Sequence, residues 1–329
     1  MKPLTHFSIV VPIYNGAETL DDCLTALVHQ DYPQDRYEVL VVDDGSTDDT
    51  VEIALRYPVR LISFGANQGR VVARNTGARE AQFETLVFND VRVIPEREML
   101  AKIHQRNYQP LIPVVYDYDG SRWGFSRFFF LLRCKIYAPY YPLPEKEFFI
   151  TPANFDQVPK GAGNLVCDRE LWLVCQPQTA DKSTNDDTRI LREIVKDHPI
   201  LRATTITVEY HQRTDLRAVV AHTFWRGPRF ADYYLRPGGR YYAPYVAIWL
   251  VLGLTILGVI LAPAIGLLSG GGLLLLGLVA AALYLSQTIT DFIVVLTSLP
   301  IIVGAFGLGI LRWQAMQLIE YLVKTESQV

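Results

Sequence analysis

The chain has 329 residues, of which 50% are apolar by type and 20% are charged, and its 31 basic side chains nearly balance its 34 acidic ones. This composition excludes a disordered, collagen-like or disulfide-scaffold protein, and the length suggests two domains. The charge is unevenly spread, because only Asp291, Arg312, Glu320, Lys324 and Glu326 lie beyond residue 240. The small net charge of the preceding part gives no general attraction to nucleic acid, so we expect no nucleic-acid partner.

Short apolar runs alternate with helical patterns in the N-terminal part of the chain. The runs at 8–12, 37–43, 59–64 and 85–88 predict strands, and the segments 18–29, 47–57 and 69–81 between them predict helices. Continuous apolar strands separated by helices indicate an α/β domain with a parallel sheet covered on both faces. Ligands of such sheets bind beyond the carboxyl ends of the strands, so the residues that follow each strand are the candidates for a site.

Two adjacent carboxylates, Asp43 and Asp44, end the second predicted strand. The Asp-Gly-Ser-Thr sequence that starts at Asp44 makes a good turn and helix N-cap, which is one interpretation of the pattern. Two neighbouring carboxylates are more than a cap needs, however. A carboxylate that faces the cleft can accept the imide N–H of uracil or a ring N–H of guanine. Both interpretations stay open on the residues alone.

Three segments carry a family resemblance: 7–16 (FSIVVPIYNG), 41–50 (VVDDGSTDDT) and 67–77, which contains NQGR and ARNTG. In order, spacing and residue type they closely resemble the N-terminal signature of glycosyltransferase family 2, the inverting enzymes of GT-A fold. The resemblance extends over about residues 7–239. It implies a Rossmann-like domain that binds a nucleotide-diphospho-sugar.

The resemblance also implies which residues bind the UDP- or GDP-sugar. Arg70 and Arg74 are expected near the diphosphate, because guanidinium groups bind phosphate in a bidentate geometry. For Arg74, an ordinary charge on a helix surface is the alternative. Asn89, which follows the fourth predicted strand, is a further candidate. The residues that the resemblance places at the base and ribose are Pro12, Tyr14, Asp43 and Asp44.

A metal site is expected after the fourth strand, where the family carries a D-x-D motif that bridges Mg²⁺ or Mn²⁺ to the diphosphate. The sequence there is FNDVRVIP, with Asp90 as its single carboxylate. Depending on the register, Arg92 or Phe88 takes the place of the other aspartate. Mg²⁺ tolerates one or two carboxylates when substrate phosphates and waters complete its octahedron, so we expect the metal at Asp90. Positive charge supplied directly by Arg92 is the alternative.

Two further segments resemble the acceptor side of the family. In the first, 160–170 (KGAGNLVCDRE), Gly161 and Gly163 permit close backbone approach, and Asp168 is expected to cap the helix that follows. The second, 183–191 (STNDDTRIL), stands where family members carry Glu-Asp before a helix. One register equates Asp187 with the catalytic aspartate of the family, and the other equates Asp186 with it.

An inverting transfer needs one general base and no covalent intermediate. A carboxylate beside a second carboxylate has its pKa raised toward the working range, which suits Asp187, or Asp186, to remove the proton of an acceptor hydroxyl. If the acceptor is a phosphate, it needs little base assistance, and the aspartate then mainly orients it. The alternative is that both aspartates are partners of a helix dipole.

The C-terminal part predicts membrane helices. Residues 241–290 and 292–311 contain no charged side chain, and about 20 apolar residues suffice to cross a bilayer. We expect three spans near 243–267, 271–289 and 292–311, with breaks at Gly270–Gly272 and at 286–291. Two spans with a re-entrant segment are the first alternative, and buried helices of a soluble core are the second.

The catalytic half is expected on the cytoplasmic face. The first residues lead straight into the first strand without the apolar segment and cleavage site of a secretory signal. Four arginines between residues 226 and 240 precede the first span, and positive residues flank membranes on the cytoplasmic side. The four cysteines form no C-x-x-C pair and suit a reducing compartment.

The segment 213–242 predicts a basic amphipathic helix at the membrane interface, with Trp225 at the level of the headgroups. Anchoring to anionic lipids is one interpretation of its basic residues. The other is that they hold the phosphate of a polyprenyl carrier. The segment 122–133 is a second interfacial candidate, and Asp291 is expected to cap a helix rather than to act within the membrane. The candidate residues for binding the lipid acceptor are Arg213, Arg217, Arg226 and Arg229.

These expectations combine into one hypothesis. Residues 1–212 form a cytoplasmic GT-A domain, 213–242 an interfacial segment, 243–312 the transmembrane helices and 313–329 a tail. The protein then moves a sugar from a UDP- or GDP-sugar to a membrane lipid, polyprenyl or dolichyl phosphate, in cell-envelope glycan synthesis. A lipid-linked saccharide or glycolipid is the alternative acceptor. A non-catalytic membrane scaffold with a degenerate metal motif is the alternative of another class.

Overall fold

The computed structural model describes residues 3–117, 123–141, 146–176, 186–239 and 241–326. The chain divides into two compact units. The first contains Met1–Asp119, Ile136–Lys182 and Asp186–Gln212, and the second contains Gly120–Lys135, Ser183–Asn185 and Arg213–Val329. The last segment of the first unit ends at Gln212, and the segment Gly120–Lys135 belongs to the second unit.

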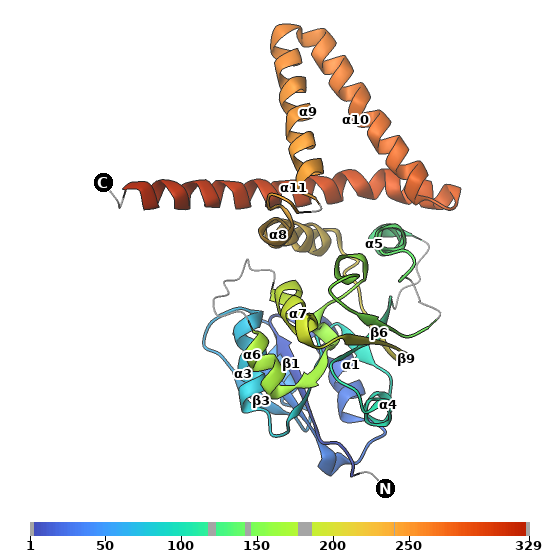
Figure 1. The fold of residues 1–329 in the computed structure, drawn as a ribbon, viewed down its shortest axis with the longest axis vertical. Coiled ribbons are helices and arrows are strands. Elements are labelled where there is room, and N and C mark those ends of the chain that lie inside the picture. The colour runs from blue at the N-terminus through green and yellow to red at the C-terminus, as the bar shows by residue number, and fades with distance from the viewer. Residues whose placement is uncertain (1–2, 118–122, 142–145, 177–185, 240, 327–329) are drawn as a thin grey trace. The chain divides into compact units, whose positions relative to one another are not determined.

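A mixed nine-stranded sheet organises the first unit (Figure 1), in the order β3-β2-β1-β4-β8-β6-β9-β5, with β7 paired to β9. The first four strands of this order run parallel, as the alternating pattern predicted. The sheet as a whole is mixed, because β8, which lies beyond the predicted strands, runs antiparallel to both of its neighbours. The strands are β1 (Phe7–Ile13), β2 (Tyr37–Asp43), β3 (Arg60–Ser63), β4 (Thr85–Phe88), β5 (Val93–Pro95), β6 (Leu111–Asp117), β7 (Phe148–Ile150), β8 (Val166–Asp168) and β9 (Ile200–Tyr210).

Helices cover both faces of this sheet. Successive strand residues point to opposite faces, and in β1 Ile9 and Val11 enter one apolar core while Val10 enters the other. The first core packs on α1 (Ala17–Val28), α2 (Thr50–Ala54) and α4 (Met99–Arg106). The second core packs on α3 (Arg70–Glu80), α6 (Arg169–Cys175) and α7 (Asp186–Asp197). Among the described residues of this unit, short 3₁₀ turns lie at Gln34–Arg36, Phe155–Gln157 and Ala162–Asn164.

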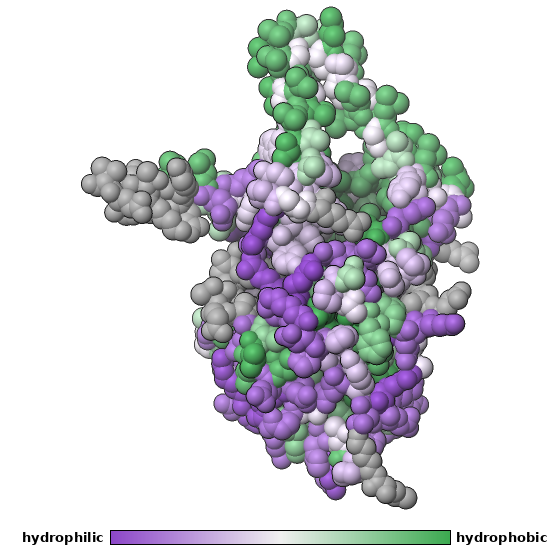
Figure 2. All heavy atoms as spheres, in the orientation of Figure 1, coloured by the Kyte–Doolittle hydropathy of each residue, from purple (hydrophilic) through white to green (hydrophobic). Residues whose placement is uncertain are grey.

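The second unit is helical. It contains α5 (Gly124–Ile136) except for its last residue, α8 (Leu216–Tyr234), α9 (Tyr242–Leu261), α10 (Pro263–Leu285) and α11 (Ile289–Glu326). By length and apolar composition, Tyr242–Leu261, Pro263–Leu285 and Ile289–Ile319 are candidate membrane spans. Figure 2 shows the hydrophobic side chains gathered over α9 and α10. Long apolar helices thus follow the α/β domain.

The first break between the apolar helices lies at Ala262 and not at the expected Gly270–Gly272. Pro263 is the reason, since it lacks the backbone N–H that would continue α9 and it suits the first turn of α10. Gly270 instead lies where α10 packs closely on α9, because a Cβ there would lie 2.6 Å from Cγ2 of Thr255 on α9. Small residues at such crossings allow apolar helices to approach closely in a membrane.

The apolar run of α5 is packed inside the second unit. Phe128 and Leu131 share a buried cluster with Ala282 and Leu285 of α10 and Val295 of α11. Of the two interpretations for this segment, burial against the apolar helices is therefore the one that the structure favours.

Asp291 lies in the first turn of α11, where its backbone N–H donates to Thr288 Oγ1 (3.1 Å) and its carboxylate accepts from Gln287 N (3.2 Å). This is the expected role of a residue that caps a helix. The same carboxylate also accepts from Arg127 of α5 through two bonds, at 2.6 and 3.0 Å.

Candidate active site

The loops after β1 and β2 are tied together at the carboxyl edge of the sheet. Asn15 has a left-handed backbone (φ 48°), and its side-chain oxygen accepts from Thr47 N at 2.8 Å. Asp48 accepts from Ala17 N at 3.2 Å, and Thr50 Oγ1 accepts from Gly16 N at 3.0 Å. Partial burial acts to raise the pKa of Asp48, but the hydrogen bonds from Thr50 and from Ala17 N hold that pKa below its ordinary value. Pro12 is buried beneath this rim and Tyr14 is exposed on it.

Both carboxylates at the end of β2 are buried and hydrogen-bonded. Asp43 accepts from Ser46 N (3.0 Å) and from the hydroxyl of Ser63 (2.6 Å), which stands at the end of the neighbouring β3. Asp44 accepts from the backbone N–H groups of Gln68 (2.6 Å) and Gly69 (2.8 Å). These two bonds fix the start of α3, which begins at the next residue, Arg70. An ionised carboxylate offers about four lone-pair sites, so Asp43 and Asp44 each retain capacity for a ligand.

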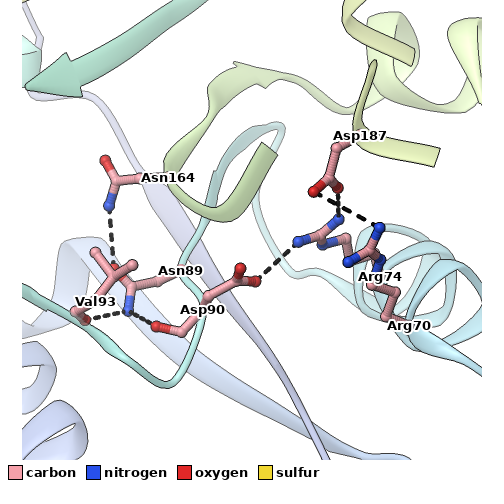
Figure 3. Close-up of polar contacts among 7 residues, drawn as sticks. All are labelled: Arg70, Arg74, Asn89, Asp90, Val93, Asn164 and Asp187. Atoms are coloured by element: carbon pink, nitrogen blue, oxygen red, sulfur yellow. Dashed lines mark hydrogen bonds and ion pairs between the residues drawn. The ribbon is translucent and has the colours of Figure 1, made fainter. Parts of the chain in front are cut away.

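Helix α3 carries two arginines whose side chains approach the same aspartate. Arg70 and Arg74 are four residues apart and therefore lie on the same face of the helix. Nη1 of Arg74 donates to Asp187 Oδ1, and Nη2 of Arg70 lies 3.8 Å from Asp187 Oδ2 (Figure 3). Asp187 stands in the first turn of α7. Segments more than 100 residues apart in the sequence thus meet at this point.

Arg74 also reaches Asp90. Its Nη2 donates to Asp90 Oδ1 at 2.8 Å, so one guanidinium group joins two carboxylates (Figure 3). The Arg74 side chain is 2% exposed, whereas that of Asp90 is 43% exposed and that of Asp187 is 25% exposed. The interpretation of Arg74 as an ordinary surface charge was therefore wrong. Asp90, Asp187 and Arg70 form the accessible side of the cluster, and Arg74 forms its buried centre.

The turn that carries Asp90 is held by buried polar groups. Asn89 is fully buried, and its amide donates to the carbonyls of Val93 (2.8 Å) and Asp90 (3.1 Å), while its oxygen accepts from Asn164 (3.2 Å). In this structure the Asn89 side chain shapes the turn, and its contact with the nucleotide stays a prediction. Asn164 and Ser63 were not foreseen. Their partners are distant in the chain, so no local pattern points to them.

Gly163 packs directly on Asp90. The backbone carbonyl of Gly163 accepts from Asp90 N at 2.8 Å. A Cβ at Gly163 would lie 2.3 Å from Oδ2 of Asp90, whereas one at Gly161 would meet nothing within 4 Å. The close approach expected for this glycine-rich segment therefore concerns Gly163 alone. Asp168 has an extended backbone just before α6 but makes no side-chain capping hydrogen bond.

Arg92 points away from this cluster. It forms an ion pair with Glu18 of α1 and donates to the carbonyl of His211 at 3.3 Å. The side chain is 14% exposed and already compensated. Arg92 therefore does not supply the positive charge that would replace a metal.

With Asp90 as its single carboxylate ligand, the site can hold only certain metal ions. No group of three or more His, Cys, Asp or Glu side chains within the described ranges gathers to bind a metal. The half-exposed carboxylate of Asp90, with one oxygen on Arg74, therefore fits only a cation that takes its other ligands from a substrate and from water. Mg²⁺ bound through substrate phosphates has this requirement.

The candidates for the lipid acceptor belong to the second unit. Arg217 and Arg226 are exposed, and Arg213 and Arg229 are partly buried. Helix α8 carries three of the four, begins after Asp215, which accepts from Ala218 N at 2.8 Å, and continues through Pro228. The side chain of Asp186, the other candidate base, lies outside the described part of the chain.

Comparisons with known proteins agree with this architecture. Residues 8–163 match the family model "Glycosyl transferase family 2". Glycosyltransferase AglE of Haloferax volcanii is 38% identical over 104 residues, which are 30% of this chain and 34% of the relative. A dolichyl N-acetyl-alpha-D-glucosaminyl phosphate 3-beta-D-2,3-diacetamido-2,3-dideoxy-beta-D-glucuronosyltransferase of Methanococcus voltae is 29% identical over 103 residues, 30% of this chain and 32% of the relative. The chain thus covers about a third of the length of each of these relatives.

One solved structure resembles nearly the whole chain. The mannosyltransferase PcManGT from Pyrobaculum calidifontis, in complex with GDP-Man and Mn²⁺, matches with a TM-score of 0.55 and 20% identity. The match covers 93% of this chain and 87% of that one, and it shows a shared fold. With the sheet described above, residues 8–163 lie within an α/β domain of GT-A-like fold that is similar to glycosyltransferase family 2.

Proposed function

We propose that the protein transfers a sugar, with inversion, from a UDP- or GDP-sugar to a lipid acceptor at the cytoplasmic face of a membrane. The observation that carries this proposal is the cluster in which Arg74 joins Asp90 and Asp187. It brings a metal-ligating type of residue, two cations and a candidate base together beyond the strand ends, where ligands of such sheets bind. The Asp90 side chain is 43% exposed, so its carboxylate is accessible to a ligand.

The donor binds across the loops after β1, β2 and β4 in this proposal. Tyr14 and the edge formed by Asp43 and Asp44 receive the base and ribose, with Pro12 supporting the loop from below. Arg70 lies on the side of the diphosphate, where its more exposed guanidinium group offsets negative charge, and the buried Arg74 supports that side by holding Asp90 and Asp187 in place. The relative whose complex contains GDP-Man supports a nucleotide-sugar as the donor.

Asp90 is the residue that would hold a divalent metal. The ion, when bound, would neutralise charge on the leaving diphosphate. The Mn²⁺ in the complex of the mannosyltransferase supports this assignment. Arg74 keeps the Asp90 carboxylate oriented, and Gly163 leaves it the space that it occupies.

Asp187 faces the acceptor in this proposal. It is held between Arg70 and Arg74, which fixes its position relative to the donor. For a hydroxyl acceptor it takes the proton as the hydroxyl oxygen attacks the anomeric carbon and the diphosphate leaves from the opposite face. For a phosphate acceptor, which is already ionised, Asp187 orients the attacking oxygen.

The acceptor is a membrane lipid, in the first place a polyprenyl or dolichyl phosphate. The long apolar helices and the basic residues on and beside α8 (Arg213, Arg217, Arg226 and Arg229) support it. A dolichyl-phosphate-linked sugar is the second candidate, and the name of the relative from Methanococcus voltae favours it. These two acceptors differ in whether Asp187 must remove a proton.

An assay of nucleotide release distinguishes these functions. Purified protein in lipid vesicles is given UDP- and GDP-sugars, alone, with polyprenyl phosphate and with a polyprenyl-diphosphate-linked saccharide. Release of UDP or GDP that rises with one lipid supports that acceptor. Absence of release with every donor and acceptor would favour a scaffold. Release that EDTA and Asp90→Ala leave unchanged would refute the metal assignment.

A further inference from the structure

Helix α11 contacts both ends of the helical hairpin that α9 and α10 form. Helix α9 leads away from Tyr242, the chain turns at Ala262, and α10 returns to Leu285. In a hairpin whose two helices both cross a bilayer, the start of α9 and the end of α10 lie at the same membrane face. We call these two ends the feet of the hairpin.

The contacts of α11 with the two feet lie far apart along that helix. At the foot of α10, Leu285 shares a buried cluster with Val294 and Val295 of α11. At the foot of α9, the hydroxyl of Tyr245 accepts a hydrogen bond from Gln314 of α11. From Val294 to Gln314 an α-helix rises about 30 Å, which is the thickness of the hydrocarbon core of a bilayer.

This spacing excludes a third crossing in the observed arrangement. If α11 crossed the bilayer from the foot of α10, Gln314 would reach the opposite face, near the Ala262 turn and far from Tyr245. Its bond to Tyr245 instead keeps both parts of α11 at the level of the feet. Figure 1 shows α11 running across the base of the α9–α10 pair.

One side of α11 is buried against protein and the other is apolar and exposed, as expected for a helix that lies at a membrane face. One stripe, which includes Ser298, Ile302 and Ala305, is buried within the unit. Helix α8 packs so closely that a Cβ at Gly309 would lie 2.1 Å from the carbonyl oxygen of Phe224. The other side is apolar and uncovered, with Ile293 44%, Ile301 39% and Leu308 59% exposed. A helix in the interface buries one apolar face in lipid and rests its other face on protein or water.

We propose that only α9 and α10 cross the membrane, and that α11 lies in the plane of the bilayer face from which they rise. Its exposed apolar side then contacts the acyl chains, and α8 packs on its other side. The C-terminal end stays on the same side of the membrane as the chain before Tyr242. Arg312, whose guanidinium lies 4.2 Å from the ring centroid of Trp225, then remains among the interfacial side chains and need not enter the opposite leaflet. The composition of α11 alone permits a span, and its contacts oppose one.

Membrane depth of spin labels tests this proposal. Cys134 and Cys175 are changed to serine, the buried Cys23 and Cys167 are kept, and single cysteines are labelled at Ile293, Ile301 or Leu308 of the full chain in vesicles. We expect depths that agree within about 5 Å, because the helix lies in one plane. A label at Ile301 about 12 Å deeper than one at Ile293 would overturn the proposal, since eight residues of a crossing helix rise that far.

Helix α9 supplies the matched control. Labels at Ile248, Leu254 and Leu261 stand on exposed positions of a helix that crosses the membrane in either account. Their depths must first increase and then decrease along α9, which shows that the method resolves a crossing helix in this protein.

A topology assay that needs no substitution gives a second readout. One epitope tag is fused to the C-terminus and another, in a separate protein, is inserted at Ala262. Protease added to the face that carries the N-terminal domain should remove the C-terminal tag and leave the Ala262 tag intact. Protection of the C-terminal tag under these conditions would overturn the proposal. The result does not depend on catalytic activity, so failure of the proposed function would not affect it.

Discussion

Arg74 donates to Asp90 at 2.8 Å through one terminal nitrogen and to Asp187 through the other, and its own side chain is 2% exposed. A buried guanidinium between two carboxylates fixes their separation, because its nitrogens have a rigid planar geometry. The loop after β4 and the start of α7 are thereby held together as the two sides of one site.

Substitution Arg74→Lys should reduce kcat/KM by about 100-fold, equivalent to about 2.7 kcal/mol of transition-state stabilisation. The ammonium group keeps the charge but cannot donate in two fixed directions. Initial rates of nucleotide release measure the effect, and the melting temperature in detergent reports folding. Arg70→Lys is the control, since Arg70 lies 3.8 Å from Asp187 and is more exposed, so it should lose less activity. Activity near that of the wild type in Arg74→Lys would show that the bridge is only structural.

The two candidate bases can be separated by matched substitutions. Asp187→Asn should lower kcat by about 10²–10⁴-fold for a hydroxyl acceptor, the usual contribution of a general base, and less for a phosphate acceptor. Asp186→Asn should retain most of the activity, because it is Asp187 that meets Arg74 and Arg70. The opposite order of the two losses would assign the base to Asp186 and contradict the register used here.

Gly163→Ala should impair the site although glycine contributes no functional group. The added methyl would lie 2.3 Å from Asp90 Oδ2, so the carboxylate must move. We expect a loss of at least about 10-fold in kcat/KM, with the KM for the donor raised if Asp90 binds it through a metal. Gly161→Ala, two residues away, has open space and an extended backbone, and should behave like the wild type. Equal effects of the two substitutions would show that the Asp90 contact is irrelevant.

The ion pair between Arg127 and Asp291 should stabilise the second unit. Removal of one partner of a buried pair costs about 3–5 kcal/mol, because the other charge is left without compensation. Arg127→Met should therefore lower the melting temperature by about 5–10 °C, whereas Arg217→Met on the exposed surface of α8 should leave it unchanged. The double variant Arg127→Met/Asp291→Leu should recover part of the loss. No recovery would mean that the loss in Arg127→Met does not come from leaving the Asp291 charge uncompensated.

The buried cysteines Cys23 and Cys167 should react with alkylating agents much more slowly than an unperturbed thiol at the same pH. Burial raises the pKa of Cys23 to about 12 and also raises that of Cys167, so both stay protonated at pH 8.5. At that pH about one Cys23 in three thousand is a thiolate, whereas an unperturbed thiol is half ionised. Alkylation followed by mass spectrometry should therefore leave Cys23 and Cys167 unmodified in the native protein and modify both after denaturation. Their rapid modification in the native protein would contradict the packing around them.

The first half of the sheet could be predicted from the sequence because its information is local. The apolar runs that became β1, β2 and β4 differ from the observed bounds by at most one residue at each end. Helix α2 is shorter than predicted, because residues after Asp44 hydrogen-bond with the loop after β1 instead of continuing a helix. The antiparallel β8 has only three residues, and its direction depends on pairing with β4 and β6, which no local pattern records.

The sequence pattern identified residues of the candidate site better than it identified the role of each one. The pattern could select Arg74, Asp90 and Asp187, because their motifs recur at strand ends and helix starts. It could not distinguish Asn89, which looks like a ligand but is buried by contacts with Val93 and Asn164. In the same way, the composition of α11 suits a membrane span, and only its contact with Tyr245 indicates another position.

The most direct test of the account is to find the glycosylated lipid itself. Vesicles that contain the protein and polyprenyl phosphate are incubated with UDP- and GDP-sugars, and the lipids are extracted and weighed by mass spectrometry. The account predicts a polyprenyl phosphate heavier by one sugar residue with one of the donors, and a much slower appearance of that product with Arg74→Lys. If folded wild-type protein forms no glycosylated lipid with any donor, whether from polyprenyl phosphate or from a lipid-linked saccharide, the proposed transfer is contradicted.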